Sequence, residues 1–203
     1  MIYNRLTSLF YESHDTKSMA KALLGCELVH DSPDGLTSGI IIETEAYLQD
    51  DPACHAYNRY TPRTQPMYGD PGTIYVYHIY GMYQCLNVVS NRAGIGEAVL
   101  IRALKPIRGL ELMHARRERA HSRANVSRKK MRTEDLCSGP GKLVQSMGIS
   151  KALHNNGTFT EGDLFIIPAQ ISGFEIDVTT RIGLRVGTEL PYRYIIREDA
   201  LKM

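Results

Sequence analysis

The segment from Thr73 to Val89 constrains the fold more than any other part of the sequence. Residues 73–79 are rich in β-branched and aromatic side chains and predict a strand, as do residues 83–89. Tyr80-Gly81-Met82 lies between them and predicts a turn. Two strands joined by so short a connection pair as an antiparallel hairpin. The turn carries large apolar groups, although the tips of hairpins normally face solvent.

A second hairpin is predicted upstream, with strands at residues 27–30 and 38–47 joined by the turn Ser32-Pro33-Asp34-Gly35. Asp15 or Thr16 can cap a short helix that Gly25 ends. Further helices are predicted at residues 107–119 and 141–147, and further strands at residues 97–103, 164–167, 175–178, 181–186 and 192–196. Residues 48–72 predict a long irregular loop, and such loops are usually functional or disordered.

Strands outnumber helices in this prediction, and both hairpins indicate antiparallel pairing. We therefore predict an α+β fold, a single domain with a mixed, mainly antiparallel sheet flanked by helices and a protruding β-hairpin. A chain of 203 residues is long enough to bury one sizeable core. Neither a linker nor a repeat divides it, so we expect residues 1–203 to form one domain.

The composition argues against several classes of protein. No apolar run approaches the length of a membrane span, and the N-terminus lacks the features of a secretory signal. Cys26, Cys54, Cys85 and Cys137 are scattered without a CxxC pair, so we expect reduced thiols in a cytoplasmic protein. The glycine-containing loops lack the dinucleotide and phosphate-loop patterns. We therefore expect no cofactor and no metal.

Positive charge is concentrated in one segment. Residues 102–132 hold eleven Lys or Arg and two acids, a net charge of +9, whereas the rest of the chain holds 13 basic and 20 acidic residues, a net charge of −7. Such a block in a nearly neutral protein indicates a polyanionic partner, such as nucleic acid. A solvated helix end or a mobile loop explains it equally well. Lys142 lies beyond the block and is at most a weak phosphate contact.

Glu43, Glu45 and Tyr47 share one face of a predicted strand, because side chains alternate along a strand. Two carboxylates beside a tyrosine can act as a general base and a helper, or as a pair of metal ligands. A solvated polar face is the simpler interpretation of the triplet Glu43-Thr44-Glu45, and for the triplet alone it is the favoured one.

Tyrosine is unevenly distributed, because eight of the twelve tyrosines fall between Tyr47 and Tyr83. A tyrosine-rich sheet can be a packed core whose hydroxyl groups reach the surface. Tyr80 and Met82, however, lie at the predicted turn, where burial is difficult. An exposed aromatic ring near a basic block suits a wedge that enters between the base pairs of DNA.

Several segments resemble the alkyladenine (3-methyladenine) DNA glycosylase family: GIIIETEAY, ACHAYNRYTPRTQPMYGDPGTIYVYHIYGMYQCLNV, AVLIRALKPIRGLE and LCSGPGKL. The matching order extends from about residue 18 to residue 196, and the blocks together are highly specific. The resemblance implies base-excision repair, in which a damaged purine is flipped out of duplex DNA and its N-glycosidic bond is hydrolysed. Cys54 departs from the pattern, because a small residue such as Ala is expected there.

The resemblance also implies roles for individual residues. Glu45 matches the general base that activates water, and Arg102 matches the arginine that helps to hold this water. Tyr47, His55 and Tyr77 match the residues that line the pocket and sandwich the flipped base, and His55 can also hydrogen-bond the base edge. From the residues alone, His55 is an ordinary loop histidine, and the two tyrosines are core aromatics.

Three further residues complete the resemblance. Tyr80 matches the residue that intercalates in place of the flipped base, and Met82 is expected to be a second contact at the tip. Asn87 matches the pocket residue that crowds out the exocyclic amino group of normal guanine. The alternative is that the Asn87 side chain merely satisfies a neighbouring backbone group.

Two other classes of function stay open at this stage. One is a non-catalytic nucleic-acid-binding module that uses the basic block and Tyr80 without any chemistry. The other is a metal-dependent hydrolase that uses Glu43, Glu45 and His55.

A glycosylase with this sequence is expected to be monofunctional. No lysine lies between Lys21 and Lys105, the region that holds every candidate site residue, and a Schiff-base lyase needs an amine at the sugar. We expect a monomer whose partner is double-stranded DNA with damaged purines, and no membrane partner.

Overall fold

The computed structural model describes residues 3–81, 83–123 and 131–197. Its strands are β1 (Glu27–Ser32), β2 (Gly35–Tyr47), β3 (Ile74–Ile79), β4 (Tyr83–Val89), β5 (Ala98–Arg108), β6 (Leu164–Ile167), β7 (Ile176–Thr179) and β8 (Arg193–Ile196). Its helices are α1 (Ser8–Glu12), α2 (Thr16–Ala22), α3 (Leu110–Arg123), α4 (Pro140–Met147) and α5 (Lys151–His154), with short 3-10 turns η1 (Gln65–Tyr68) and η2 (Thr133–Asp135).

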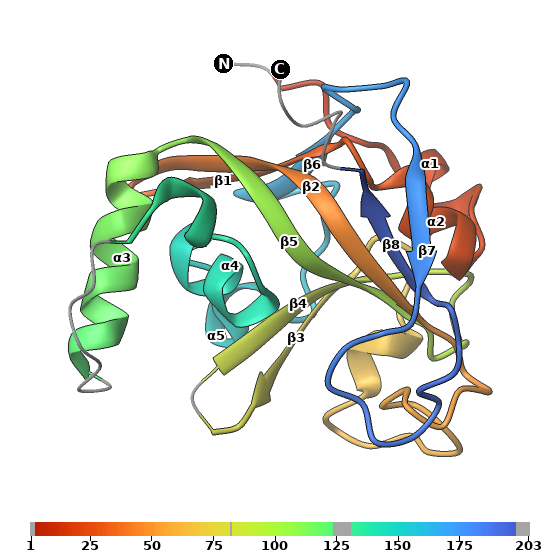
Figure 1. The fold of residues 1–203 in the computed structure, drawn as a ribbon. Coiled ribbons are helices and arrows are strands. Elements are labelled where there is room, and N and C mark those ends of the chain that lie inside the picture. The colour runs from red at the N-terminus through yellow and green to blue at the C-terminus, as the bar shows by residue number, and fades with distance from the viewer. Residues whose placement is uncertain (1–2, 82, 124–130, 198–203) are drawn as a thin grey trace.

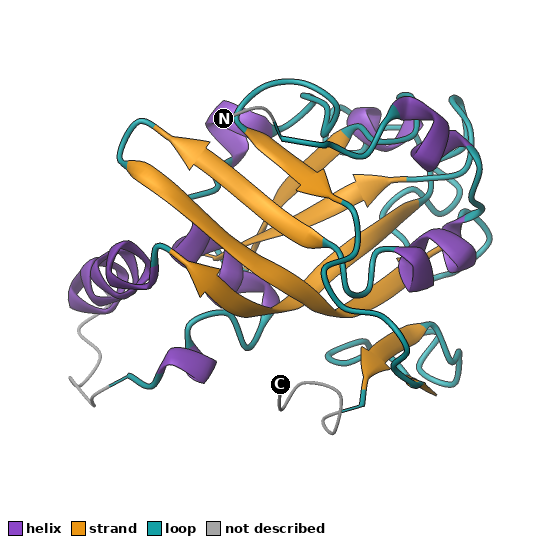
Figure 2. Ribbon diagram, turned by 90° about the horizontal axis from the view of Figure 1, so that it is seen from above, coloured by secondary structure: helices purple, strands orange, loops and turns teal. Residues whose placement is uncertain are grey.

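One curled sheet organises the described residues, with helices around it (Figures 1 and 2). The strand order is β3-β4-β5-β2-β1-β6, and β8 pairs with both β2 and β7. Every pairing between these strands is antiparallel, so the sheet has no parallel part within the described residues. The predicted α+β fold is confirmed. In Figure 1 the β3–β4 hairpin extends from the sheet beside α4.

β2 is the central strand of the sheet. β1 pairs with residues 35–40 along one edge, β8 pairs with residues 43–45 farther along that edge, and β5 covers the other edge. The register between β2 and β5 shifts on both sides of Glu43. Such irregularities bend a strand and redirect its side chains. They lie at the stretch of β2 that carries both predicted carboxylates.

Helices α2 and α4 pack on the sheet and close the core. Met19 of α2 and Leu143 and Met147 of α4 are fully buried in one cluster with the sheet. The Asp15 carboxylate accepts the backbone N–H of Ser18 at 2.7 Å, which caps α2 as its sequence predicts. Within the described residues, no helix is long and apolar enough to cross a membrane.

The predicted strand at residues 181–186 is wrong, because this segment forms an irregular loop. Gly183 and Gly187 adopt positive φ angles of 78° and 59°, which a strand does not contain. Arg181 points its side chain into the protein instead of alternating along a strand. Ile182 and Val186, the β-branched residues of this segment, are 48% and 51% exposed, so they belong neither to a sheet nor to the core.

The predicted start of the helix at residue 107 is also wrong. Residues 107 and 108 belong to β5, and α3 begins at Leu110. Gly109 separates the two elements with a φ of 73°, and a side chain there would collide with the backbone of Leu36. Helices α1 and α5 were not predicted, because five and four residues are too short for a periodic pattern.

Candidate active site

Glu45 lies on β2 with its side chain completely buried. The Tyr47 hydroxyl donates to its Oε2 at 2.7 Å, and the backbone N–H of Ile182 donates to its Oε1 at 3.1 Å. Arg102 Nη1 lies 3.4 Å from the same Oε1. An ionised carboxylate only accepts hydrogen bonds, and these partners are all donors. The surroundings of Glu45 therefore suit a buried carboxylate anion.

Arg102 joins the two carboxylates that the sequence places on one face. Its Nε lies 2.9 Å from Glu43 Oε1, and Arg193 of β8 pairs with the same oxygen. The Glu43 side chain is only 14% exposed. The interpretation of Glu43-Thr44-Glu45 as a solvated polar face is therefore wrong. Because arginines already engage both carboxylates, a metal shared between them would have to displace a guanidinium.

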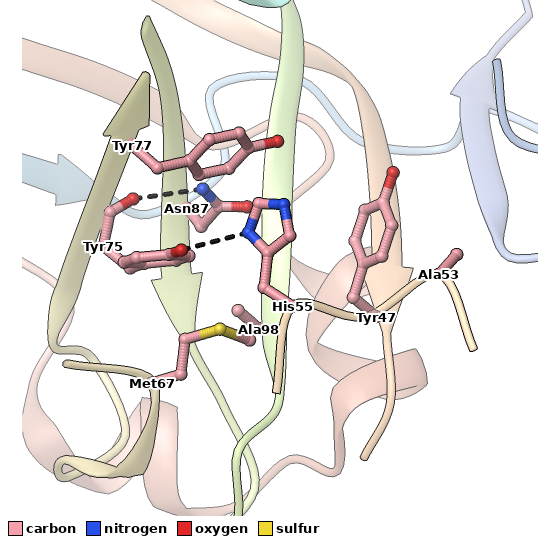
Figure 3. Close-up of a pocket in the computed structure, with 8 residues that line it drawn as sticks. All are labelled: Tyr47, Ala53, His55, Met67, Tyr75, Tyr77, Asn87 and Ala98. Carbon is pink, nitrogen blue, oxygen red and sulfur yellow. Dashed lines mark hydrogen bonds between the residues drawn. The ribbon is translucent and has the colours of Figure 1, made fainter. Parts of the chain in front are cut away.

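A pocket lies beside this carboxylate, and Tyr47 belongs to both (Figure 3). Its cavity volume is about 20 Å³, room for one or two water molecules. The loop of residues 48–72 and strands β2 to β5 supply the lining. The residues that line it are Tyr47, Ala53, His55, Met67, Tyr75, Tyr77, Asn87 and Ala98.

Aromatic rings form most of the pocket wall. Tyr75 and Tyr77 alternate on β3 and share one face, and His55 meets Tyr77 edge-on with ring centroids 4.4 Å apart. In Figure 3, Tyr47 lies on the other side of His55 from these two tyrosines. Burial, the largest effect, raises the pKa of the Tyr47 and Tyr77 hydroxyls well above the usual range. Both phenols therefore stay neutral.

His55 is held as a neutral imidazole with a defined tautomer. The Arg63 guanidinium approaches its Nε2 at 3.3 Å, and because arginine only donates, this nitrogen must accept. The proton then sits on Nδ1, which lies 3.0 Å from the Tyr75 hydroxyl. Burial, and after it the nearby Arg63 and Arg59, lower the pKa of His55 to about 4. The pocket wall therefore carries no positive charge from this histidine at neutral pH.

Asn87 lines the pocket from β4 and also serves the backbone. Its Nδ2 donates to the carbonyl oxygen of Tyr75 at 3.1 Å across the β3–β4 hairpin. This bond confirms that the Asn87 side chain satisfies a neighbouring backbone group. That bond also fixes the orientation of the amide at the pocket wall, so the two roles are compatible.

Tyr80 lies at the tip of the β3–β4 hairpin and is 80% exposed. Its φ is +50°, a left-handed conformation that is rare for a bulky residue, and Gly81 follows with a φ of 74°. Ile79 pairs with Tyr83, so three residues form the turn. The third, Met82, lies outside the described residues. Tyr80 is three residues from Tyr77, so the hairpin connects the exposed tip to the pocket.

Comparison with known proteins decides what kind of site this is. The family model of methylpurine-DNA glycosylase (MPG) matches residues 9–200. The chain belongs to this family. It is a DNA glycosylase, a hydrolase of the N-glycosidic bond that removes alkylated purines in base-excision repair. The family resemblance predicted from the sequence motifs is confirmed.

Relatives of this glycosylase are similar over most of their length. A protein of Rubrobacter xylanophilus is 45% identical over 174 residues, which cover 86% of this chain and 85% of the relative. One of Methanoculleus marisnigri is 43% identical over 199 residues, 95% of each chain, and one of Carboxydothermus hydrogenoformans is 41% identical over 191 residues, 94% of each. All three carry the name "Putative 3-methyladenine DNA glycosylase".

The basic block of this glycosylase is used partly inside the protein. Arg108 pairs with Glu27, with the closest N–O distance 2.6 Å, and the half-buried Arg116 donates to the Ser32 hydroxyl at 2.9 Å. Arg117 is buried and bonds Gln145. Residues 124–130, which hold three more of the basic residues, lie outside the described residues. The net charge of the segment therefore overstates what it offers to DNA.

The sequence did not point to Arg181, which lies beside Tyr47 in the loop after β7. Its buried guanidinium pairs with Asp51 and donates to the Ala46 carbonyl at 2.9 Å. It also lies 4.6 Å from the centre of the Tyr47 ring. Asp51 and Arg181 are 130 residues apart, so no local pattern could join them. Ile182, the next residue, gives Glu45 its backbone hydrogen bond.

Proposed function

We propose that this glycosylase flips a methylated purine out of duplex DNA and that Glu45 activates the water that attacks the sugar carbon. The base leaves, and the product is an intact abasic site. The observation that carries this proposal is the completely buried Glu45 carboxylate, which is held by Tyr47, Ile182 and Arg102 at the edge of an aromatic pocket.

Glu45 has the properties that a general base needs here. Ile182 and Arg102 both approach Oε1, whereas Tyr47 takes one direction at Oε2, so this ionised oxygen can accept a further bond, for example from water. Hydrolysis of an N-glycosidic bond builds positive charge on the sugar, which a buried carboxylate also stabilises. General-base assistance typically contributes about 10²–10⁴-fold in rate. The Arg102 guanidinium near Glu45 provides donors that can hold the same water.

The aromatic wall suits a flat base that carries positive charge. An alkylated purine placed between Tyr47 on one side and the His55–Tyr77 pair on the other stacks on neutral, electron-rich rings. Stacking of a base on an aromatic side chain contributes roughly 1–3 kcal/mol. A cavity of about 20 Å³ is too small for a purine, so the pocket must widen. The loop of residues 48–72 supplies Ala53, His55 and Met67 to this pocket, so we expect it to shift when a base enters.

Tyr80 has the position of a wedge that takes the place of the flipped base. Insertion of an apolar side chain between base steps offsets an unstacking cost of about a few kcal/mol. A ring that is already exposed at the hairpin tip needs no rearrangement of the core to enter the duplex. Met82 would add a second contact there, and Asn87 would crowd the exocyclic amino group of normal guanine.

The remaining parts of the proposal concern the product and the setting. Residues 22–104, which hold every proposed site residue, contain no lysine, so we expect no amine at the sugar and a monofunctional enzyme. All four cysteines are free and buried, as suits a reducing compartment such as the cytoplasm, or the nucleoid if the source is bacterial. The protein acts as a monomer and as one domain that spans residues 1–203.

Product analysis tests this function against a binding module that does no chemistry. Duplexes with single lesions of different kinds, including 7-methylguanine and hypoxanthine, are incubated with the protein. We expect release of the free damaged base and an abasic site that breaks only after alkali. Borohydride should trap no covalent adduct. Tight binding without base release would contradict the glycosylase mechanism, and a trapped adduct would contradict the monofunctional one.

A further inference from the structure

A second cluster of titratable side chains lies apart from the pocket. His30 is on β1, His154 is the last residue of α5, and Asp163 directly precedes β6. Neither histidine is more than 4% exposed, whereas the Asp163 side chain is 51% exposed. None of the three lines the pocket or contacts Glu45. The cluster therefore needs an explanation of its own.

The distances within this cluster are those of ligands around one metal ion. His30 Nε2 and His154 Nε2 lie 3.3 Å apart, and Asp163 oxygens lie 3.6 Å from His30 Nε2 and 3.8 Å from His154 Nε2. Zinc binds histidine nitrogen at about 2.0–2.1 Å in a tetrahedron, which places two ligand atoms about 3.3 Å apart. The histidine pair already has this spacing. Different oxygens of Asp163 approach the two nitrogens, so the carboxylate must turn one oxygen toward both of them to bind the ion.

The backbone orients both histidines as metal ligands. His30 Nδ1 lies 2.6 Å from the carbonyl oxygen of Met147, and His154 Nδ1 lies 3.0 Å from that of Ser150. When each Nδ1 donates its proton to the carbonyl, each Nε2 carries a free lone pair. Histidine ligands in metal sites are typically held by such a bond from the second nitrogen. Two lone pairs that face each other across 3.3 Å repel unless a cation lies between them.

The metal-free protein has another way to satisfy this pair. The backbone N–H of Ser150 lies 3.1 Å from His154 Nδ1, so this nitrogen can accept a hydrogen bond instead. His154 Nε2 then donates to His30 Nε2. Metal binding then requires the exchange of one imidazole tautomer and a turn of the exposed Asp163 side chain. The two histidines are therefore hydrogen-bonded to each other when no metal ion is bound.

We propose that His30, His154 and Asp163 bind a divalent transition metal of the zinc class, with water as the fourth ligand. This inference departs from the expectation of no metal that the sequence supports. That expectation rests on the spacing of the cysteines, whereas the three ligands proposed here are spread over 134 residues. The exposed carboxylate gives the ion a path from solvent. Two imidazoles and one carboxylate are ligands that zinc prefers in proteins.

The position of the site indicates a structural task. His154 ends α5, and the next residues hold the base of the β3–β4 hairpin: Asn155 Oδ1 accepts the Val76 N–H, and the Asn156 N–H donates to Ile74 O, both at 2.9 Å. A metal ion would fasten this segment to β1 and to the turn before β6. We therefore expect the ion to stabilise the hairpin that carries Tyr77 and Tyr80 without taking part in base release.

Titration of the chelator-treated full chain with zinc tests the proposal. Calorimetry should give one zinc ion per chain, the melting temperature should rise with zinc concentration, and cobalt should give the absorption of a tetrahedral site. Asp163→Asn should weaken zinc binding at least about tenfold, and His154→Gln should abolish it. His114→Gln, a histidine on α3 outside the cluster, should bind zinc as the parent protein does. Base release at low temperature should persist in chelator.

Two results would overturn the proposal. One is the absence of saturable zinc binding to the parent protein. The other is parental zinc affinity in Asp163→Asn, whose exposed side chain makes loss of the fold an unsuitable explanation. Circular dichroism of each variant identifies one that has not folded, and Asp163→Asn then carries the test if His154→Gln fails. Both results leave the proposed role of Glu45 untouched.

Discussion

The Tyr47 hydroxyl donates a 2.7 Å hydrogen bond to Glu45, so one side chain forms a wall of the aromatic pocket and also holds the buried carboxylate. Both residues lie on β2, two positions apart, on the same face. The Arg181 guanidinium lies 4.6 Å from the centre of the Tyr47 ring and is itself paired with Asp51. In the proposed mechanism, Tyr47 therefore couples binding of the base to activation of water.

Replacement of Tyr47 by Phe should separate these two roles, because it removes the hydroxyl and keeps the ring. A hydrogen bond to a charged group contributes about 1.5–3 kcal/mol. We expect the single-turnover rate of base release to fall about tenfold to a hundredfold, whereas affinity for a lesion duplex changes little. Rate and affinity are measured on the same oligonucleotide. A loss of affinity with an unchanged single-turnover rate at saturating enzyme would mean that the hydroxyl acts on binding alone.

Replacement of Tyr80 by Asn should maintain or raise the stability of the protein and slow excision from duplex DNA. Tyr80 has a φ of +50°, a conformation that costs an ordinary residue roughly 1–2 kcal/mol and that asparagine tolerates. We expect the free energy of unfolding to stay constant or rise by up to about 1 kcal/mol. Excision from duplex DNA should slow, while excision from a single-stranded lesion oligonucleotide should not. An unchanged rate on the duplex would rule out the wedge.

Replacement of Arg181 by Met should destabilise the protein strongly, because it leaves the buried Asp51 carboxylate without its partner. Loss of one member of a buried ion pair typically costs 3–5 kcal/mol, on the order of a third or more of the stability of a domain. Arg119→Met, at an exposed position of α3, is the matched control and should change stability by less than about 0.5 kcal/mol. Chemical denaturation measures both. Similar values for the two variants would contradict the assigned role.

The free energy of unfolding below pH 6.5 should depend on His55. Its pKa is about 4 in the folded protein, below the ordinary value of 6.5, so the unfolded chain binds this proton more readily. The contribution of His55 to stability is therefore complete above pH 6.5 and is lost as pH falls from 6.5 toward 4. One proton gives a slope of at most about 1.4 kcal/mol per pH unit.

His55→Gln isolates this effect, because glutamine does not titrate. Between pH 6.5 and pH 4.5 we expect the variant to lose less stability than the parent protein. The rate of base release by the parent should also show no inflection near pH 6.5. Parallel stability curves for the two proteins would mean that His55 has an ordinary pKa in the fold.

The strands and the chemistry of the site were predictable from the sequence to different degrees. The boundaries of β4 and β6 are predicted to the residue, because turn residues bound each strand: Gly81 and Asn91 for β4, Gly162 and Pro168 for β6. The loop after β7 is predicted as a strand, because its apolar residues alternate. The contacts of Arg181 with Asp51 and of Ile182 with Glu45, both long-range, show that this loop turns inward.

The site shows the same limit. Local spacing placed Glu43 and Glu45 on one face, but it favoured a solvated face, because burial depends on Arg102 and Arg193 from other strands. The family motifs pointed to Glu45, Tyr47, His55 and Tyr77, which the structure brings together. Arg181 and Ile182 lie outside the quoted motifs, so no motif reveals them. Their roles depend on tertiary contacts, and local patterns in a single sequence do not reveal such contacts.

The central claim, that Glu45 is the base that activates water, is tested most directly by one pair of variants. Glu45→Gln and Glu43→Gln make the same substitution on the same face, and both side chains face Arg102. Single-turnover base release from a duplex with one lesion is measured with enzyme in excess over its dissociation constant. We predict that Glu45→Gln slows release at least about 10²-fold with unchanged affinity, whereas Glu43→Gln slows it less than about tenfold. Base release by Glu45→Gln at the parental rate would contradict the account.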